Sequence, residues 1–202
     1  MGTDRLDAVL TQARDLGFLG PGPVADQRAH AEAFLGVLDG VPTSAVDLGS
    51  GGGLPGLVLA AALPGSRWLL VDAMVKRTRF LEDAIRTLGL ATRVEVCTAR
   101  AEDLGRSRRA TANLVVARGF GPPAVTAECA APLLEVDGLL VVSEPPGGDG
   151  GRWAREGLAE LGLAVVGHVT GPPAFIRLRQ SMVCPERFPR RSGVPRKRPL
   201  WS

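Results

Sequence analysis

The stretch VDLGSGGGLPGLVLA, residues 46–60, decides the fold. A mostly apolar run that contains Asp47 ends at Leu48. Glycines follow at positions 49, 51, 52 and 53, and an apolar segment comes after Pro55. This order predicts a strand that turns tightly into a helix, because glycine adopts positive φ freely and lets backbone N–H groups approach a ligand closely. In doubly wound α/β sheets ligands bind at such turns, beyond the carboxyl ends of the strands.

The rest of the chain alternates between apolar strands and helices of about ten residues, which indicates parallel strand pairing with helices on both faces. Strands are expected at 45–49, 67–72, 92–97, 112–117, 138–143, 163–169 and 174–180, and helices at 4–16, 26–38, 54–62, 75–88, 122–135 and 151–161. The last two strands are joined by TGPP, which is too short for a crossover, so they should pair antiparallel at or near an edge. Residues 145–151, PPGGDGG, are expected to form a loop.

We therefore predict an α/β protein with a mostly parallel seven-stranded sheet and an antiparallel edge hairpin. A short helical cap is expected at residues 1–40, the main domain at 41–182 and a basic tail at 183–202. The tail holds six of the basic residues and one acidic residue, so it carries more positive charge than the +3 of the whole chain. A short basic segment of this kind is typical of contact with a phosphate backbone, although a solvated chain end has the same composition.

Composition excludes several classes of protein. Hydrophobic residues make up 45% of the 202 residues and charged residues 22%, a globular balance. No apolar run reaches the roughly 20 residues of a membrane span, and the first residues lack the basic start of a signal peptide, so we expect a cytoplasmic protein. Cys97, Cys129 and Cys184 lie far apart without a CxxC pair, so neither a disulfide framework nor a metal site is expected. We also expect a monomer.

The second predicted strand ends in Asp72, 19 residues after Gly53. A carboxylate at this position can accept hydrogen bonds from both hydroxyls of a ribose, so the two features together predict a nucleoside site. The spacing of Gly49, Gly51 and Leu54 fits the dinucleotide fingerprint GxGxxG poorly, because Leu54 stands at the third position, where the fingerprint has Gly or Ala. Asp47, GSGGG and Pro55 instead resemble the motif of S-adenosylmethionine methyltransferases of the class I, Rossmann-like fold.

Several motifs together resemble one family, the RsmG (GidB) methyltransferases, which methylate N7 of a guanine in small-subunit (16S) ribosomal RNA. They are VDLGSGGGLPGLVLA at 46–60, LLVDAMVKRTRFLEDAIRTLGL at 69–90, ARAEDL at 99–104, VVARGF at 115–120 and FPRRSGVPRKRPL at 188–200. The resemblance implies S-adenosyl-L-methionine as cofactor and 16S ribosomal RNA, or the small ribosomal subunit, as partner.

The resemblance also implies site residues. Cofactor contacts are expected at Gly49, Gly51, Gly53, Leu54 and Asp72, with Ala101 and Glu102 beside the adenine. Arg118 is expected at the mouth shared by cofactor and substrate, as both a cofactor-binding and a catalytic residue. The expected RNA contacts are Lys76, Arg77, Arg100, Arg190, Arg191, Arg196, Lys197 and Arg198.

Guanine N7 carries an in-plane lone pair and can attack a sulfonium methyl group without first losing a proton. No general base is needed, which suits a chain whose two histidines, His30 and His168, we interpret as structural. Methylation of an exocyclic amine usually goes with an Asn/Asp-Pro-Pro-aromatic motif that is absent here. Methylation of cytosine C5 needs a thiolate nucleophile, and none of the three cysteines is placed to supply one.

Two features depart from the family pattern. The N-terminal helices lack the family's Trp-Asn pair and Asn-Leu-Thr stretch, and Ser143, Glu144 and Pro145 stand where the family has Lys-Gly. An acid in place of a lysine at a rim that meets RNA weakens its attraction to phosphate. Two alternatives therefore stay open: an enzyme of this fold that acts on another RNA or a small molecule, and a cofactor-binding protein without catalysis.

Overall fold

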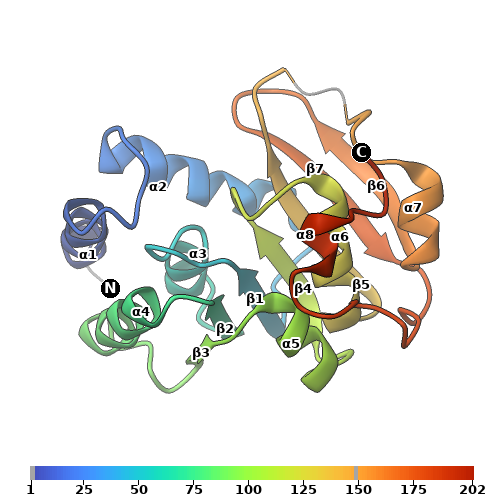
Figure 1. Cartoon of the computed structure of the whole chain (residues 1–202). Coiled ribbons are helices and arrows are strands. Elements are labelled where there is room, and N and C mark those ends of the chain that lie inside the picture. The colour runs from blue at the N-terminus through green and yellow to red at the C-terminus, as the bar shows by residue number, and fades with distance from the viewer. Residues whose placement is uncertain (1–2, 148–149) are drawn as a thin grey trace.

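The computed structural model describes residues 3–147 and 150–202 (Figure 1). Residues 1–2 of the expected cap and 148–149 of the expected loop lie outside the described residues. One seven-stranded sheet runs through the molecule in the order β3-β2-β1-β4-β5-β7-β6. The strands are β1 (Ser44–Leu48), β2 (Arg67–Asp72), β3 (Val94–Thr98), β4 (Ala112–Ala117), β5 (Leu134–Glu144), β6 (Leu163–Val169) and β7 (Ala174–Gln180).

Strand pairing confirms the predicted sheet. β1 lies between β2 and β4, parallel to both, and β3 and β5 continue the parallel sheet on either side. β7 pairs antiparallel with β5 and with β6, so the last two strands form a hairpin at the edge. Because chain order reverses between β1 and β4, the carboxyl ends of β1, β2 and β4 border one crevice, the usual ligand site of doubly wound sheets.

Helices cover both faces of the sheet (Figure 1). They are α1 (Thr3–Asp15), α2 (Val24–Glu32), η1 (Ala33–Val37), α3 (Gly56–Ala62), α4 (Val75–Thr87), α5 (Ala101–Ser107), α6 (Pro123–Ala130), η2 (Ala131–Leu133), α7 (Arg155–Glu160) and α8 (Val194–Lys197). Successive strand residues contribute to opposite faces, as the period of two requires: Leu70 packs with the α1–α4 side and Val71 with the α5–α7 side. The alternation fixes which face each site residue enters.

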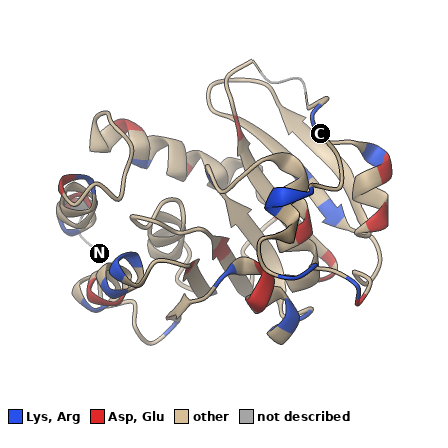
Figure 2. Ribbon diagram, viewed as in Figure 1, with Lys and Arg blue, Asp and Glu red and all other residues tan. Residues whose placement is uncertain are grey.

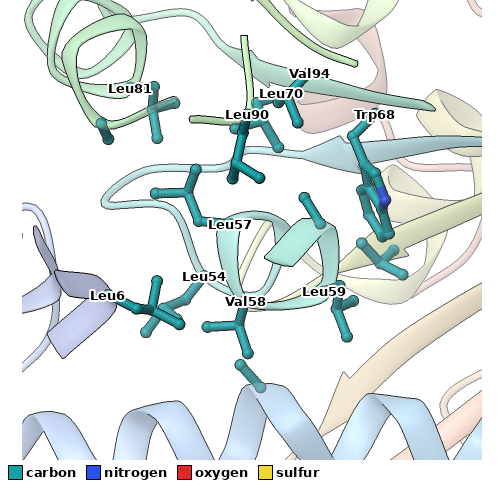
Figure 3. Close-up of a cluster of buried hydrophobic side chains, with 14 of the residues drawn as sticks. Leu6, Leu54, Leu57, Val58, Leu59, Trp68, Leu70, Leu81, Leu90 and Val94 are labelled. Carbon is teal, nitrogen blue, oxygen red and sulfur yellow. The ribbon is translucent and has the colours of Figure 1, made fainter. Parts of the chain in front are cut away.

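Helix α3 is the centre of the first core. Leu57 and Leu59 are fully buried, and Figure 3 shows the α3 side chains between Leu6 of α1 on one side and Trp68 and Leu70 of β2 on the other. The expected N-terminal cap therefore packs directly on the helix that follows the glycine turn. Because burial of one large apolar side chain contributes about 1.5–3 kcal/mol, this contact holds the cap firmly against the sheet.

Several helix boundaries differ from the prediction. The expected helix at 54–62 begins at Gly56, because Gly49 to Pro55 form the turn. The expected helix at 122–135 is divided into α6 and η2, and β5 begins already at Leu134. α5 and α8 were not predicted, since α5 has the largely polar sequence AEDLGRS and α8 has only four residues.

The tail after β7 is packed against the sheet-covering helices. Cys184 and Phe188 are buried, and the Arg190 guanidinium donates to both carboxylate oxygens of Glu128 on α6, at 2.8 and 2.6 Å. The carboxylate of Glu128 is fully buried, so this ion pair anchors the tail, because removing either charge would leave the other uncompensated. No helix in the described part of the chain has both the length and the apolar character that crossing a membrane requires.

Candidate cofactor site

A cleft of about 300 Å³ opens at the carboxyl ends of β1 and β2. Its walls come from the ends of these strands, from α4, α5 and α6, from the segment after β4 and from the tail. The lining residues are Gly49, Val71, Asp72, Ala73, Met74, Arg77, Ala99, Arg100, Ala101, Glu102, Gly119, Phe120, Val125, Cys129, Gly193 and Arg196. Of the eight residues predicted to contact the cofactor, the cleft brings together Gly49, Asp72, Ala101 and Glu102.

Asp72 is the acidic group at the centre of the cleft. Its side chain is almost fully buried, with Oδ2 accepting from the Gly51 N–H at 3.0 Å and Oδ1 from the Met74 N–H at 2.8 Å. The Arg77 guanidinium lies 3.5 Å from Oδ2. Each carboxylate oxygen has two lone pairs, so both keep acceptor capacity for a ligand. The protein contacts fix the carboxylate in place before any ligand arrives.

The glycine turn is tied to β2 as well as to β1. Gly49, Gly51 and Gly53 all have positive φ, at 72°, 53° and 98°, as the sequence predicted for a tight turn. Only Gly49 lines the cleft, where a Cβ would lie 2.7 Å from the Phe120 ring. A Cβ on Gly53 would instead meet Leu57 at 2.3 Å, and the Leu54 side chain is buried in the core. Gly53 and Leu54 therefore pack against the core below the turn and do not line the cleft.

Asp47 is the most deeply buried charge-bearing group near the turn. Its Oδ2 accepts from the Gly56 N–H at the start of α3, at 3.0 Å, while Oδ1 is buried without a partner among the described residues. Burial raises the pKa of Asp47 to about 7, against the Gly56 hydrogen bond and the charge of Arg118, which lower it. A Cβ on Gly56 would lie 2.4 Å from Oδ2, so glycine is required for this contact.

The opposite wall of the cleft is built by α5 and the tail. Ala101 and Glu102 begin α5, and the carboxylate of Glu102 accepts from the Gly193 N–H at 2.8 Å. Ser192 also donates to Asp103, at 2.7 Å. The tail therefore closes the side of the cleft on which the family resemblance places the adenine.

Arg118 follows β4 but is not among the residues that line the cleft. Its side chain enters the cap face of the sheet, where Nη1 donates to the Gln27 carbonyl of α2 at 3.3 Å. Burial lowers its pKa, and the charge of Asp47 raises it. Arg118 thus lies on the cap side of the sheet, close enough to Asp47 and His30 for its charge to lower the pKa of both.

The basic residues predicted for RNA separate into groups. The cofactor cleft is lined by Arg77 of α4, by Arg100 just before α5 and by Arg196 of α8. Lys76 is exposed on α4 outside the cleft. Arg191, Lys197 and Arg198 are exposed on the tail and α8, where Figure 2 shows basic residues on the ribbon. The charge of Arg190 is balanced by Glu128, and that of Arg77 by Asp72.

Motif reasoning missed several lining residues. Met74 follows Asp72 by two positions and is half exposed at the cleft, a placement that the strand end itself could have indicated. Phe120, Val125 and Cys129 also line the cleft, and the sequence analysis did not assign them to it. Burial raises the pKa of the Cys129 thiol, so it does not supply a thiolate nucleophile. Across residues 3–147 and 150–202 no three potential metal ligands cluster together.

The raised pKa of Asp47 predicts a pH-dependent stability. An unfolded aspartate ionises near pH 4, whereas folded Asp47 keeps its proton until about pH 7, so the folded state binds the extra proton between these values. This stabilisation is full below about pH 4 and is lost as pH rises to about 7, with a limit of about 4 kcal/mol. Asp47→Asn should remove the decline, because the amide oxygen still accepts from Gly56 and no charge forms.

Urea unfolding at pH 5 and pH 8 measures the effect. The loss of unfolding free energy between these pH values should be smaller in Asp47→Asn than in the unaltered chain and in Asp83→Asn, which removes an exposed carboxylate from α4. Equal losses in all three proteins would show that Asp47 is ionised throughout.

Comparison with known proteins agrees with this geometry. Residues 33–144, more than half of the chain, match the model of the family GidB, described as rRNA small subunit methyltransferase G. A curated protein of that name from Prochlorococcus marinus (strain MIT 9313) is 36% identical over 177 residues, covering 80% of this chain and 69% of that protein.

Solved structures agree on the fold. The cofactor-bound Rv0187 protein from MTB superposes with a TM-score of 0.62 at 17% identity, covering 89% of this chain and 91% of the other. The N,N-8-amino-8-demethyl-D-riboflavin dimethyltransferase RosA from Streptomyces davawensis has a TM-score of 0.62 at 22% identity, covering 75% and 54%. These likenesses show the class I methyltransferase fold. With the family match over residues 33–144, they establish that the chain belongs to the rRNA small subunit methyltransferase G (GidB) family and is an S-adenosylmethionine-dependent methyltransferase.

Proposed function

We propose that the chain transfers a methyl group from S-adenosylmethionine to N7 of a guanine in 16S ribosomal RNA. The observation that carries the proposal is the family match over residues 33–144, which include the glycine turn, Asp72, α5 and the end of β4. Because ribosomal RNA is its proposed substrate, we also propose that the protein acts in the cytoplasm. We also propose that the chain acts as a monomer.

The cleft has the chemistry that the adenosine part of the cofactor needs. The fixed carboxylate of Asp72 can accept from the ribose hydroxyls, and Met74, Ala101 and Val125 offer apolar surface for the adenine ring. We propose that Glu102 lies beside the adenine while it holds Gly193 in place. When bound, the cofactor supplies an electrophilic methyl group on its sulfonium.

Arg118 and Asp47 are proposed to serve the amino-acid end of the cofactor. The two side chains interact electrostatically, and Asp47 keeps a buried oxygen without a partner among the described residues, to which a ligand ammonium could donate. A half-buried guanidinium beside it could hold a carboxylate. Arg118 would then position the methyl donor for the reaction and would take no part in proton transfer.

No general base is needed for attack by N7, and the cleft contains no histidine. His30 forms a 2.7 Å hydrogen bond with Ser143, and burial, followed by the charge of Arg118, lowers its pKa. Catalysis would consist mainly of alignment, which is a large effect when the reacting atoms are held about 3–3.5 Å apart.

The sequence suggested that the negative charge of Glu144 at the rim would weaken attraction to RNA, but Glu144 is not an exposed charge. Its side chain is buried, and one oxygen accepts from Arg152 at 3.1 Å. The exposed charges that we assign to the RNA face are basic: Lys76 and Arg100 beside the cleft, with Arg191, Arg196, Lys197 and Arg198 on the tail. This charge distribution favours RNA over a small-molecule substrate.

Methyl transfer tests the proposed function directly. Purified protein with labelled cofactor should label small ribosomal subunits or their RNA, and nuclease digestion with mass analysis should recover the label as N7-methylguanosine. Label in another nucleoside, or in a pool of small molecules in place of RNA, would reject guanine-N7 methylation of 16S ribosomal RNA.

Asp72→Asn tests the cofactor site. Loss of the charged acceptor should weaken binding of S-adenosylhomocysteine at least tenfold in calorimetry, because hydrogen bonds to a charged group contribute about 1.5–3 kcal/mol. Asp83→Asn, on exposed α4 surface, should bind as the unaltered chain does. Unchanged affinity in a folded Asp72→Asn protein would remove Asp72 from the site.

The tail tests the RNA face. Replacing Arg191, Lys197 and Arg198 by alanine removes exposed charge without touching the cofactor cleft or the Arg190–Glu128 ion pair. RNA affinity should fall, and the slope of log affinity against log salt should flatten by up to about 2, given about 0.7 per single-strand phosphate contact. The control is alanine at Arg5, Arg67 and Arg86, three exposed arginines elsewhere. Equal slopes in the two triple variants would reject the tail as an RNA contact.

A further inference from the structure

A second cavity of about 300 Å³ adjoins the cofactor cleft at the carboxyl ends of β4 and β5. The two cavities share Gly119 and Phe120 as a common wall. On its other sides the second cavity is bounded chiefly by Val142 and Glu144 at the end of β5 and by Arg152 and Trp153 in the segment before α7. A group held there would lie next to the cofactor.

At the end of β5 the cavity is bordered by the carboxylate of Glu144, which can accept further hydrogen bonds. Glu144 is 4% exposed, and Arg152 occupies Oε1 at 3.1 Å. Oε2 is buried and has no hydrogen-bond partner among the residues that the structure describes. A buried carboxylate oxygen without a donor is costly, so the site favours a ligand that brings N–H groups.

Two further features suit a planar base. The Trp153 indole is 4% exposed, and its Nε1–H is also buried without an acceptor in the described part of the chain. The half-buried Phe120 ring forms part of the wall toward the cofactor. Extruded bases are generally held by stacking on aromatic side chains and by hydrogen bonds to the Watson–Crick edge.

Of the four RNA bases only guanine presents two adjacent donors, N1–H and the 2-amino group, on that edge. Adenine and cytosine each place an acceptor nitrogen beside their single amino group, and uracil flanks one N–H with two carbonyls. A carboxylate therefore attracts the guanine edge and repels an acceptor nitrogen. Guanine also has O6, an acceptor that an indole N–H can satisfy.

We propose that this second cavity binds the substrate guanine, with Glu144 accepting from N1–H and the 2-amino group as the residue that selects the base. N7 lies across the ring from the anchored edge, so it would face the wall shared with the cofactor cleft. The inference rests on the proposed function and deepens it, because it assigns base selection to a residue of this chain.

The test uses mononucleotides and the full chain saturated with S-adenosylhomocysteine. Guanosine 5′-monophosphate should shift the Trp153 indole N–H signal in NMR titrations and saturate. Inosine 5′-monophosphate, which lacks the 2-amino group, should bind several-fold more weakly, and adenosine 5′-monophosphate at least tenfold more weakly. The phosphate is common to all three, so the differences report on the base.

Glu144→Gln should reduce guanosine monophosphate affinity at least tenfold and remove the preference over the adenine nucleotide. The matched control is Glu160→Gln, which changes an exposed carboxylate on α7. Equal binding of the three nucleotides by the unaltered chain, no binding of the guanine nucleotide, or a folded Glu144→Gln protein with unchanged selectivity would overturn the assignment.

Methyl transfer measured on the same preparations separates the two proposals. Transfer to RNA guanine without nucleotide selectivity would reject the Glu144 pocket and leave the proposed function standing. Selective binding of the guanine nucleotide without any transfer to RNA would support the pocket and reject the proposed function.

Discussion

The site depends on one hydrogen bond, from the Gly56 N–H to the buried carboxylate of Asp47. It fixes the first turn of α3 against the end of β1, and it requires a glycine because a Cβ at position 56 would overlap the carboxylate. Ser50 extends the constraint to β2, since its N–H donates to Val71 and its hydroxyl accepts from Val71. The turn, the helix and the two strand ends therefore form one rigid unit.

The carboxyl edge of the sheet carries two different cavities. Asp72 at the end of β2 faces the cofactor cleft, and Glu144 at the end of β5 borders the second cavity. Both carboxylates are buried and held by neighbouring donors, so neither needs to reorganise when a ligand arrives. Preorganised acceptors contribute to binding without the loss of freedom that a mobile side chain would suffer.

Much of the fold could be predicted because the strands are apolar on both faces and the turns are rich in glycine and proline. α5 was missed because its exposed positions are polar, so only its contact with the tail and α6 distinguishes it from a loop. Arg118 illustrates a different limit. It lies two residues after Val116, which faces the cap side, so the period of two could have predicted its direction. The second cavity could not be predicted, since the chain from Pro145 to Trp153 gives no local indication that Trp153 returns to the end of β5.

The hydrogen bond from the Gly193 N–H to Glu102 determines when the cofactor cleft is completed during synthesis. Residues 49 to 129 supply most of the cofactor cleft, but its last wall comes from Gly193 and Arg196. Because the chain is made from its N-terminal end, the glycine turn and strands β1 to β4 leave the ribosome before this wall does. The adenosine pocket is therefore complete only after the segment that holds Gly193 and Arg196 has been made and has packed against α5.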